Sequence, residues 1–442
     1  MVIFAEVLVL LLLFTIFYTY LWGSLYEHAV LIPFADRGNW AMIIMYPLML
    51  LVFGKIFGIF HVAVARRVDM IFSIVFTSLI TNVITYFVLV ALLRTHYPDP
   101  TPLILLFVLE SAIAVLWVLS VKTFNNILFP PHQLLLIHGN YSVKDLVLHV
   151  NERSERYVIS EEINVYESMD LLEERIAAHD AVLISDLPAE LRNDVLKYCF
   201  NIDKRIYMLP KITDIIISSS EQIHLFDNVA YISKNYGLSQ DQRIFKRVLD
   251  LVIASVMTIL TSWIMVIAAI AIKLDDGGPV FYRQDRLTIS GKVFRIIKFR
   301  SMHVDAEKAG PQLSTKKDPR ITRAGRILRA SHLDELPQLF NVLRGDMSMV
   351  GPRPERPEIA AEYTQGVPEF NFRLKVKAGL TGYAQVYGRY NSTPYNKLRL
   401  DLTYIQNYSI WLDIKCIVMT VKILFQKENR EGIDEGSKTA QK

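Results

Sequence analysis

Two adjacent acidic residues, Asp334 and Glu335, stand just before Pro337 in the segment SHLDELPQLFN. Proline lacks an amide hydrogen and is tolerated only in the first turn of a helix. The sequence therefore predicts a helix through residues 338–343 that begins near Leu333 or Asp334. Both carboxylates would lie at the positive end of the helix dipole, where the ionised form is favoured. Acids at helix starts are also common as simple caps, so the pair alone does not establish catalysis.

Basic residues surround this acid pair in the sequence. Three arginines recur every third residue upstream, which would place them on roughly one face of a helix: Arg323, Arg326 and Arg329. Residues 291–302 read as a strand that could present Lys298 and Arg300 to phosphates, or to anionic lipid headgroups. Residues 351–354 form a Gly-Pro-Arg-Pro turn that either is purely structural or offers the Arg353 guanidinium to phosphate oxygens. Carboxylates among arginines indicate chemistry on a phosphorylated substrate.

The composition predicts a membrane protein of more than one domain. At 442 residues the chain is long enough for two or three domains. Its hydrophobic fraction of 52% and its mean hydropathy of +0.28 exceed what soluble globular proteins usually have. The two cysteines, Cys199 and Cys416, are far apart and lack metal-ligand spacing, which fits a reducing cytosolic environment. The net charge of +4 is small, and no nucleic-acid partner is expected.

Residues 1–122 are expected to form a bundle of four transmembrane helices. Four segments are long and apolar enough to cross a bilayer: Phe4–Trp22, Trp40–Phe60, Met70–Leu93 and Leu103–Val121. The first lacks the basic region and cleavage site of a signal peptide, so we expect it to remain as a span. Glu110, in the middle of the fourth segment, is either a functional carboxylate or the centre of a buried interhelical hydrogen bond.

The loop charges predict the orientation of these spans. Arg66 and Arg67 follow the second span closely and lie near Lys55. The positive-inside rule then places this loop, both chain ends and everything after Lys122 in the cytoplasm. We therefore expect the chemistry-bearing residues on the cytoplasmic face of the membrane.

Residues 132–232 alternate between predicted strands and helices, which is typical of a parallel sheet. The predicted strands are Gln133–Ile137, Ala181–Ser185 and Lys204–Leu209, separated by helical patterns at Val143–Val150, Met169–Ala178 and Glu190–Phe200. A dinucleotide site would need three spaced glycines after the first strand, and this turn has only Gly139. The pattern favours a Rossmann-like cytoplasmic domain without an intact dinucleotide motif, with a regulatory or assembly role.

The fifth apolar segment, Val248–Ile272, has basic residues on both flanks. Both ends should therefore stay on the cytoplasmic side, which predicts a re-entrant membrane helix over residues 243–274 rather than a fifth span. The hydroxyls of Thr258, Thr261 and Ser262 can bond back to helix carbonyls and curve the axis. A plain fifth span would export every residue that follows.

From residue 275 to residue 426 the chain is basic and reads as a mixed α/β domain. Residues 379–389 form a glycine-punctuated segment that ends in Arg389. Three aromatic residues belong either to an interfacial amphipathic helix or to a helix-packing core: Tyr404, Tyr408 and Trp411. Residues 427–442 are polar without apolar periodicity and are expected to be a disordered tail.

A series of motifs over residues 243–426 resembles the bacterial sugar transferases, the monotopic polyprenyl-phosphate phosphoglycosyltransferases. The four spans and the Rossmann-like domain resemble the long form of that family. One departure from the family is Ser262-Trp263 where Ser-Pro is usual at the re-entrant break. The motifs are Asp250, Gly278-Pro279-Val280, Gln284, Lys298–Met302, Leu333–Gln338, Gly345–Ser348, Gly351–Pro354 and Gly379–Gly382.

The resemblance implies transfer of a sugar-1-phosphate from a UDP-sugar to undecaprenyl phosphate with release of UMP, the first membrane step of exopolysaccharide, capsule or O-antigen synthesis. Asp334 would attack the sugar-side phosphorus to form an aspartyl phosphosugar, and it would hold Mg²⁺. Glu335 would position or polarise the site. The implied substrate- or phosphate-binding residues are Lys298, Arg300, Arg329, Gln338, Arg353 and Arg389.

Several alternatives stay open. The rival interpretation is a non-catalytic membrane scaffold for polysaccharide assembly, in which the acid pair is structural. A multi-span transferase would need more apolar segments, and an Asp-x-Asp glycosyltransferase would need a triplet that is absent from the sequence. The expected location is the bacterial cytoplasmic (inner) membrane. The sugar, the polysaccharide pathway, the role of residues 132–232 and a homodimer are left undecided by the sequence.

Overall fold

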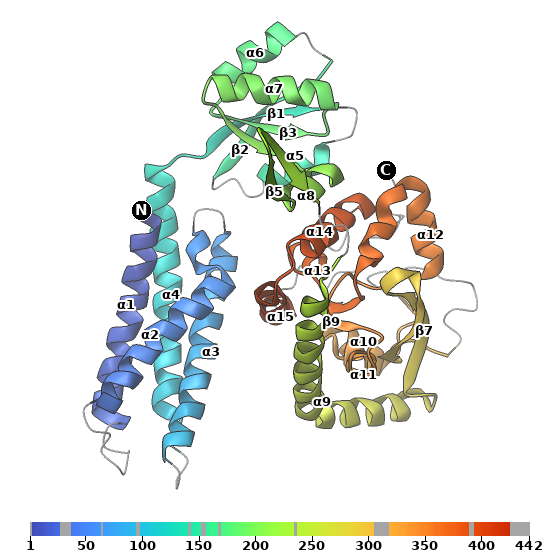
Figure 1. Cartoon of the computed structure of the whole chain (residues 1–442). Coiled ribbons are helices and arrows are strands. Elements are labelled where there is room, and N and C mark those ends of the chain that lie inside the picture. Colours follow the sequence, from blue (N-terminus) through green and yellow to red (C-terminus); the bar gives the residue numbers. More distant parts are fainter. Residues whose placement is uncertain are drawn as a thin grey trace. The chain divides into compact units, whose positions relative to one another are not determined.

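The computed structural model describes residues 2–26, 37–62, 65–93, 98–139, 143–151, 156–166, 169–233, 237–304, 318–388 and 393–424. They belong to two compact units, Met1–Leu209 and Pro210–Lys442 (Figure 1). Among the described residues, five helices are long and apolar enough to cross a membrane. The prediction of apolar N-terminal helices followed by a mixed α/β C-terminal domain is confirmed. Arg389 and the expected tail 427–442 lie outside the described residues.

Four apolar helices at the N-terminus share one hydrophobic core. They are α1 (Val2–Leu21), α2 (Arg37–Phe57), α3 (Arg67–Leu93) and α4 (Thr101–Leu128), with short helical turns at Trp22–Tyr26 and Ile59–His61. The core takes buried side chains from every helix, among them Leu10, Tyr46, Ile74 and Val118. The outward faces are also apolar, with more than half of the side chain exposed at Ile16, Ile44, Phe87 and Leu116. Apolar side chains on both faces are what a lipid surrounding requires.

Glu110 is fully buried in this core and joins three helices. Its Oε1 accepts a 2.6 Å hydrogen bond from the Tyr46 hydroxyl of α2. Its Oε2 accepts hydrogen bonds from Asn82 Nδ2, at 2.8 Å, and from the Ser78 hydroxyl, both in α3. The structure therefore supports one of the two interpretations of Glu110, namely that it is the centre of buried interhelical hydrogen bonds.

The rest of the first unit is a four-stranded parallel sheet with the order β2-β1-β3-β4. Its elements are β1 (His132–His138), α5 (Lys144–Asn151), β2 (Tyr157–Asn164), α6 (Met169–Ala178), β3 (Ala181–Ser185), α7 (Ala189–Asn201) and β4 (Arg205–Met208). Helices α6 and α7 cover one face of the sheet and α5 covers the other. The three predicted strands are present. The edge strand β2 was not predicted, because Glu161 and Glu162 interrupt its apolar pattern.

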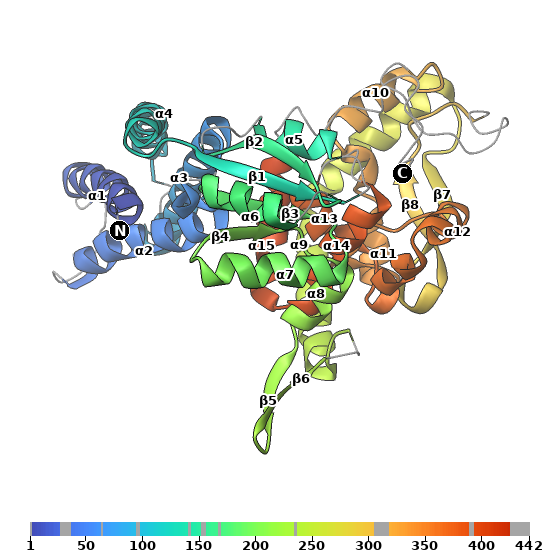
Figure 2. The same ribbon diagram turned by 90° about the horizontal axis from the view of Figure 1, so that it is seen from above.

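The sheet ends at β4, whereas the sequence placed the end of this domain at residue 232. Helix α8 (Ile212–Ser218) packs Ile212 and Ile215 into the core of the second unit. The hairpin of β5 (Glu221–Leu225) and β6 (Asn228–Ile232) follows α8 and projects away from it (Figure 2). The division between the units therefore falls near Leu209.

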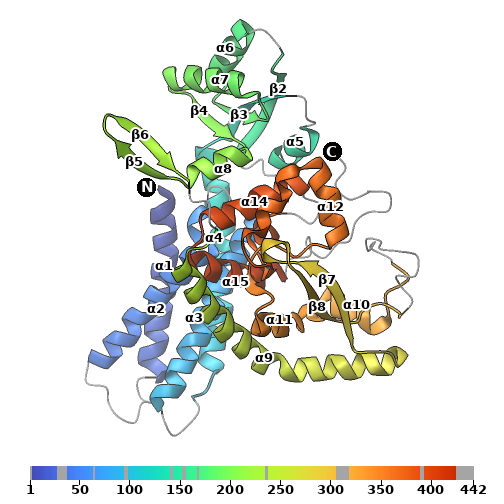
Figure 3. The same cartoon turned by 45° about the vertical axis from the view of Figure 1, so that its right-hand side comes forward.

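Helix α9 (Gln240–Asp276) contains the fifth apolar segment. It has two straight arms that meet at a bend, which is visible in two views (Figures 1 and 3). Three hydroxyls in its middle bond back to carbonyls of the preceding turn: Thr258 to Ala254 at 2.6 Å, Thr261 to Met257 at 2.7 Å and Ser262 to Ile259 at 2.8 Å. Such bonds compete with the helix ladder and bend the axis. The hydroxyls thus make the bonds that the sequence analysis expected of them.

Short elements surround α9 in the second unit. In chain order they are β7 (Phe281–Leu287), η4 (Ile289–Gly291), β8 (Val293–Phe299), α10 (Arg323–Ala330), η5 (Leu333–Glu335), α11 (Gln338–Arg344), β9 (Ser348–Val350), α12 (Pro357–Gly366), η6 (Pro368–Lys375), β10 (Gly379–Thr381), α13 (Tyr383–Tyr387), α14 (Pro394–Gln406) and α15 (Ile410–Leu424). Strands β7 and β8 pair antiparallel, and β9 and β10 pair parallel. Tyr404 and Tyr408 are buried in the core of this unit and Trp411 is half-exposed, so the helix-packing reading holds for the two tyrosines.

Candidate active site

The acid pair lies in a 3-10 turn, η5, rather than inside an α-helix. His332, with a φ of 56°, ends the preceding helix in a left-handed conformation. Helix α11 begins at Gln338, directly after Pro337. The sequence prediction of a helix that begins near Leu333 was therefore wrong by about one turn, because Pro337 allows a tight 3-10 turn before the α-helix.

Apolar contacts and one amide fix the position of this turn. Leu333 and Leu336 pack against the second arm of α9, in a cluster that includes Met265 and Ile272. Asn341 is fully buried in α11 and bonds to the backbone of β8. Its Oδ1 accepts from the Ile297 amide at 2.9 Å, and its Nδ2 donates to the Arg295 carbonyl at 2.9 Å. These contacts hold the acid pair close to β8 and its basic side chains.

Two cations hold Glu335. Its Oε1 accepts a 2.7 Å hydrogen bond from Lys298 Nζ of β8 and a 3.1 Å bond from Arg353 Nη2 of the Gly-Pro-Arg-Pro turn. Burial alone would raise the pKa of this carboxyl, but the charges of Lys298 and Arg353 outweigh it and hold the pKa well below its ordinary value. Glu335 is therefore ionised and fixed in place.

Asp334 differs from its neighbour. Among the described residues its carboxylate has no hydrogen bond or ion pair, and it is only partly buried. Burial and the charge of Glu335 raise its pKa to about 6, against the lowering effect of Lys298 and Arg329. The expectation that a helix dipole favours ionisation of both acids was thus wrong for Asp334, because burial and the neighbouring charge of Glu335 outweigh the dipole of the short helix α11. Near neutral pH the carboxylate is still mostly ionised and free to react.

Lys298, Gln338 and Arg353, three of the predicted binding residues, line one pocket together with Glu335. Its other lining residues are Arg286, Ile296, Pro354, Gly379 and Leu380. Gln338 is only 3% exposed, and its Nε2 has no hydrogen-bond partner among the described residues. A buried amide donor next to three cationic side chains is suited to a polar, anionic ligand.

The other predicted binding residues are placed differently. Arg329 Nε donates to the Ser301 hydroxyl at 2.8 Å, and its charge lowers the pKa of Asp334. Arg300 is only 5% exposed and forms an ion pair with Asp276 at the end of α9, and it does not line the pocket of Glu335. Arg300, which the sequence predicted to bind phosphate, is therefore paired with the carboxylate of Asp276 within the protein. Arg389 lies outside the described residues.

Close backbone packing explains the glycines of the two turns at this site. Gly351 and Gly379 face each other where β9 pairs with β10, and a Cβ on either one would overlap the backbone of the other. Only glycine permits this approach. It brings Leu380 and the Gly-Pro-Arg-Pro turn to the same pocket.

Sequence reasoning missed two arginines beside this site, Arg286 and Arg373. Arg286 lines the pocket of Glu335, and Arg373, which is 4% exposed, donates to the backbone carbonyl of Arg353 in that pocket. Strand alternation could have placed Arg286 on the same face of β7 as Gln284, whose Oε1 accepts from Arg286 Nη2 at 2.6 Å. Nothing in the local pattern around Arg373 signals its burial.

A metal ion would find one available carboxylate at this site. No group of three or more metal-ligating side chains occurs among the described residues. Mg²⁺ commonly takes only one or two protein carboxylates, with substrate phosphates and waters as its other ligands. Asp334 has free oxygens for such a role, whereas Glu335 Oε1 is already used by two cations. The residues present thus fit a magnesium ion that is held largely by a bound substrate.

Known proteins are similar to this chain over most of the second unit. The bacterial sugar transferase family matches residues 241–427. A UDP-glucose:undecaprenyl-phosphate glucose-1-phosphate transferase of Caulobacter vibrioides is 43% identical over 42% of this chain and 71% of its own length. The protein of the same name from Escherichia coli is 41% identical over 42% of this chain and 41% of its own. A UDP-N-acetylgalactosamine-undecaprenyl-phosphate N-acetylgalactosaminephosphotransferase of Aeromonas hydrophila is 38% identical over 40% and 43%.

The matches cover the stretch that carries every element of the site. The chain spans less than half of the Escherichia coli and Aeromonas hydrophila relatives, but more than two thirds of the Caulobacter vibrioides one. The acid pair, its basic partners and the glycine turns all lie within residues 241–427. The chain therefore belongs to the bacterial sugar transferase family.

Proposed function

We propose that this protein transfers a sugar-1-phosphate from a UDP-sugar to undecaprenyl phosphate and releases UMP. Its enzyme class is that of its relatives, which are named as undecaprenyl-phosphate sugar phosphotransferases. The observation that carries the proposal is the contrast between the two acids. Glu335 is neutralised by Lys298 and Arg353, whereas Asp334 is unbonded among the described residues and faces the same cations.

In the first step Asp334 acts as the nucleophile. An oxygen of its carboxylate forms a bond to the sugar-side phosphorus, and the bond from that phosphorus to the bridging oxygen breaks. UMP leaves with the bridging oxygen and its electron pair, so the enzyme carries an aspartyl phosphosugar. A carboxylate without hydrogen bonds is suited to this attack, because no bond within the protein must be broken first.

In the second step the lipid phosphate takes the phosphosugar. An oxygen of undecaprenyl phosphate bonds to the same phosphorus, the bond to Asp334 breaks, and the carboxylate is restored. Both steps bring an anion to an anion, so positive charge must stabilise the transition state. Lys298 and Arg353 supply it from within the pocket, and Arg329 supplies it beside Asp334. Bound Mg²⁺ would neutralise further charge on the diphosphate.

The membrane arrangement that we propose brings the acid pair to the lipid phosphate. Helix α9 would dip into one leaflet and return, with the bend at its three bonded hydroxyls. Its second arm packs directly on Leu333 and Leu336, on either side of the acids. The site would then lie at the cytoplasmic face of the bacterial inner membrane. Helices α1–α4 would form a transmembrane bundle, and a polysaccharide pathway would use the product.

The first test is UMP release by the detergent-extracted full-length protein with undecaprenyl phosphate, Mg²⁺ and a panel of UDP-sugars. UDP-glucose and UDP-N-acetylgalactosamine begin the panel, because relatives are named for both. We expect release with at least one donor, dependent on the lipid, and its loss in Asp334→Ala. Asp285→Asn is the matched control, because Asp285 is an exposed acid on β7 that pairs only with Arg295 at 3.5 Å among the described residues.

A second measurement tests the covalent step. With donor alone, the enzyme should release at most one UMP per active site and retain the sugar phosphate on Asp334. Lipid-dependent turnover without any donor-only release would refute the intermediate but not the transferase function. Folded protein that releases no UMP with any donor would favour the rival reading as a non-catalytic scaffold.

A further inference from the structure

The backbone of the Gly-Pro-Arg-Pro turn is held at every carbonyl from Pro352 to Glu355. The Pro352 carbonyl accepts from the Gly379 amide at 3.0 Å, and the Glu355 carbonyl accepts from the Leu287 amide at 3.0 Å. The two carbonyls between them accept from side chains instead. All four donors come from distant parts of the chain, so the turn is fixed by contacts outside its own segment.

The two side-chain donors are the arginines that sequence reasoning missed. Arg286 Nη1 of β7 donates to the Pro354 carbonyl at 3.1 Å. Arg373 Nη2 of η6 donates to the Arg353 carbonyl at 3.0 Å. The two guanidinium groups therefore bind the carbonyls of adjacent residues, and one of those residues is Arg353, whose side chain contacts Glu335.

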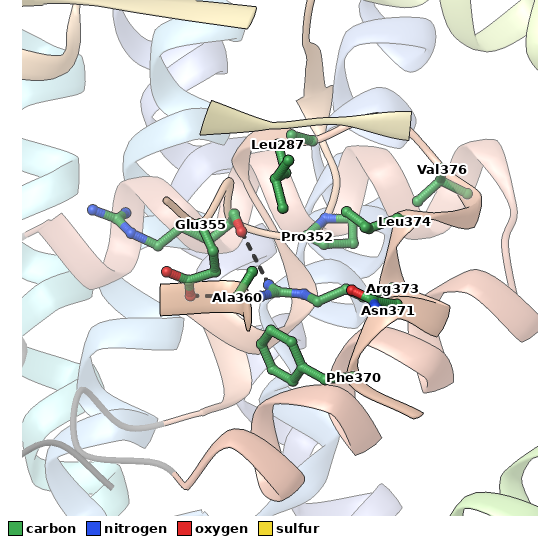
Figure 4. Close-up of a pocket in the computed structure, with 11 residues that line it drawn as sticks. Leu287, Pro352, Glu355, Ala360, Phe370, Asn371, Arg373, Leu374 and Val376 are labelled. Carbon is green, nitrogen blue, oxygen red and sulfur yellow. Dashed lines mark hydrogen bonds and ion pairs between the residues drawn. The ribbon is translucent and has the colours of Figure 1, made fainter. Parts of the chain in front are cut away.

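Each arginine is itself fixed by other contacts. Arg373 forms an ion pair with Asp401 of α14 at 2.8 Å, and its Nη1 lies 3.5 Å from Glu355 Oε1. Its guanidinium also lies over the Phe370 ring, 4.8 Å from the centroid. Figure 4 shows Arg373 and Glu355 pointing toward one another beside Pro352 and Phe370. Arg286 is held by Gln284, whose Oε1 accepts from its Nη2 at 2.6 Å.

We infer that Arg286 and Arg373 are positioning residues that aim the Arg353 guanidinium at Glu335 by clamping its backbone from two sides. Neither arginine contacts Glu335 or Asp334 in the described structure. Arg353 is the only one of the three that does so, and half of its side chain is exposed. A long, half-exposed side chain loses conformational freedom when it binds Glu335, and a fixed backbone reduces that cost. The inference rests on the proposed function, because it concerns how Arg353 serves the transfer.

A purely structural role for the two arginines is the competing explanation. Buried charges often stabilise a fold without any link to catalysis, and Arg373 leaves Asp401 unpaired when it is removed. The two explanations differ in how the variants combine. A positioning residue loses its effect once Arg353 is gone, whereas a structural residue keeps its effect.

The test is a double-mutant cycle on kcat/KM for the donor, measured by UMP release. We expect Arg286→Met to lower kcat/KM by between about tenfold and a hundredfold, the size of effect of a misplaced catalytic contact. The double variant Arg286→Met with Arg353→Met should be within about twofold of Arg353→Met alone. Arg286→Lys should recover part of the rate, since an ammonium can still donate to the Pro354 carbonyl. Arg283→Met is the matched control, because Arg283 is exposed on the other face of the same strand.

Removal of Arg373 would leave the carboxylate of Asp401 unpaired, so the Arg373 variant also replaces Asp401 by asparagine. Arg373→Met combined with Asp401→Asn should behave like Arg286→Met. Asp401→Asn alone leaves the bond to the Arg353 carbonyl and should keep most of the rate. Losses that multiply with Arg353→Met in both cycles would overturn the inference.

A readout without activity separates this inference from the proposed function. Amide hydrogen exchange at Gly379 and Leu287, which donate to the Pro352 and Glu355 carbonyls of the turn, should become faster in Arg286→Met, and in the Arg373 and Asp401 double variant, with the rest of the domain protected. Unchanged exchange in both variants would refute the clamp even if the wild type transfers sugar phosphate. Faster exchange in the variants, together with a wild type that releases no UMP, would leave the clamp standing and the function refuted.

Discussion

Replacing Glu335 by glutamine should move the acid limb of the pH–rate profile to lower pH. The pKa of Asp334 is raised from its ordinary value of 3.8 to about 6, first by burial and then by the charge of Glu335. If Asp334 is the nucleophile, the wild-type kcat/KM for the donor should be nearly level above pH 7. At pH 5 only about one molecule in eleven would have the carboxylate ionised, so the rate should fall about tenfold. An aspartate of ordinary pKa would remain mostly ionised at that pH.

The size of the shift follows from the charge that the substitution removes. The charge of Glu335 is one of the causes that raise the pKa of Asp334, and two like charges about 4 Å apart repel by about 1 kcal/mol in water and by about 4 kcal/mol at an effective dielectric constant of about 20. Partial exposure of the site reduces this effect to an expected shift of about one pH unit. The sign is fixed, because the charges of Lys298 and Arg353, which lower the pKa of Asp334, are no longer balanced by a carboxylate at position 335. Glutamine retains the shape of Glu335 and an oxygen that can accept from both cations.

The assay is kcat/KM for the donor between pH 4.5 and 8.5 at saturating undecaprenyl phosphate, in parallel for wild type and Glu335→Gln. Ionisation of the substrates is common to both proteins, so the difference between the two profiles reports a group of the enzyme. Asp285→Asn removes an exposed carboxylate from β7 and should leave the limb in place. A wild-type limb near pH 4, or a limb that Glu335→Gln does not move, would refute the assignment of the titrating group to Asp334.

Three further substitutions test other parts of the structure. Asp334→Asn should abolish transfer and raise the thermal stability at neutral pH, because burial and the charge of Glu335 disfavour the ionised carboxylate in the folded protein and asparagine carries no charge; activity and a melting curve check both. Replacing Thr258 and Thr261 by valine and Ser262 by alanine removes three hydrogen bonds to helix carbonyls, so we expect a straighter α9. Transfer should be at least tenfold slower, which is about the cost of misplaced catalytic groups. Spin-label distances between the two arms measure the bend, and UMP release measures the rate. Glu110→Leu should lower the melting temperature of the extracted protein, because it removes the acceptor of three buried hydrogen bonds. Tyr46 and Asn82 each keep a second acceptor, Asn82 Oδ1 at 3.3 Å and the Ser78 carbonyl at 3.0 Å, but the Ser78 hydroxyl loses its acceptor, at a cost of about 1–3 kcal/mol, and Glu110→Gln should cost less.

The substitutions at Glu110 and in α9 each have a matched control. Ser111→Ala removes a hydroxyl that bonds only to the Phe107 carbonyl of its own helix among the described residues, so it should leave the melting temperature of the α1–α4 bundle nearly unchanged. Thr364→Ala removes the same kind of back-bond from α12 and should not alter α9. A Glu110→Leu protein as stable as wild type would contradict the role assigned to its three hydrogen bonds. Full activity with the three α9 hydroxyls replaced would contradict the role assigned to them in the bend.

The elements that could be predicted are those whose pattern is local. Apolar runs give the five long helices, and the alternation after residue 132 gives three of the four strands of the sheet. Edge strand β2 escaped because its two adjacent glutamates break the apolar run, while its partner β1 supplies the pairing. The position of α8 escaped as well, since Ile212 and Ile215 fit either unit by pattern and only tertiary packing decides between them.

The candidate site was predictable in its residue types but not in its pairings. Lys298 and Arg300 stand two residues apart in a basic segment, which suggested a shared role. The structure joins Lys298 to Glu335 and buries Arg300 against Asp276, at the end of α9. Gly278 explains the difference, because a Cβ there would overlap the Arg300 guanidinium and only glycine leaves room for it. Such a choice depends on where the end of a distant helix lies, and no local spacing encodes that.

Helix α9 fixes the catalytic segment at both of its ends. At the C-terminus of α11, Arg247 of the first arm donates to the carbonyls of Val342 and Leu343, at 2.7 and 2.8 Å. At the other end, the second arm packs on Leu333 and Leu336, on either side of the acid pair. The bent helix α9 thus contacts both ends of residues 333–343 and fixes their position relative to Lys298 on β8. A change in the bend would move the contacts of Leu333 and of Arg247 relative to one another, so we expect it to disturb the contact between Glu335 and Lys298. The position of the acid pair therefore depends on the bend of α9. A variant with a straighter α9 should show a lower kcat while its melting temperature stays close to that of the wild type.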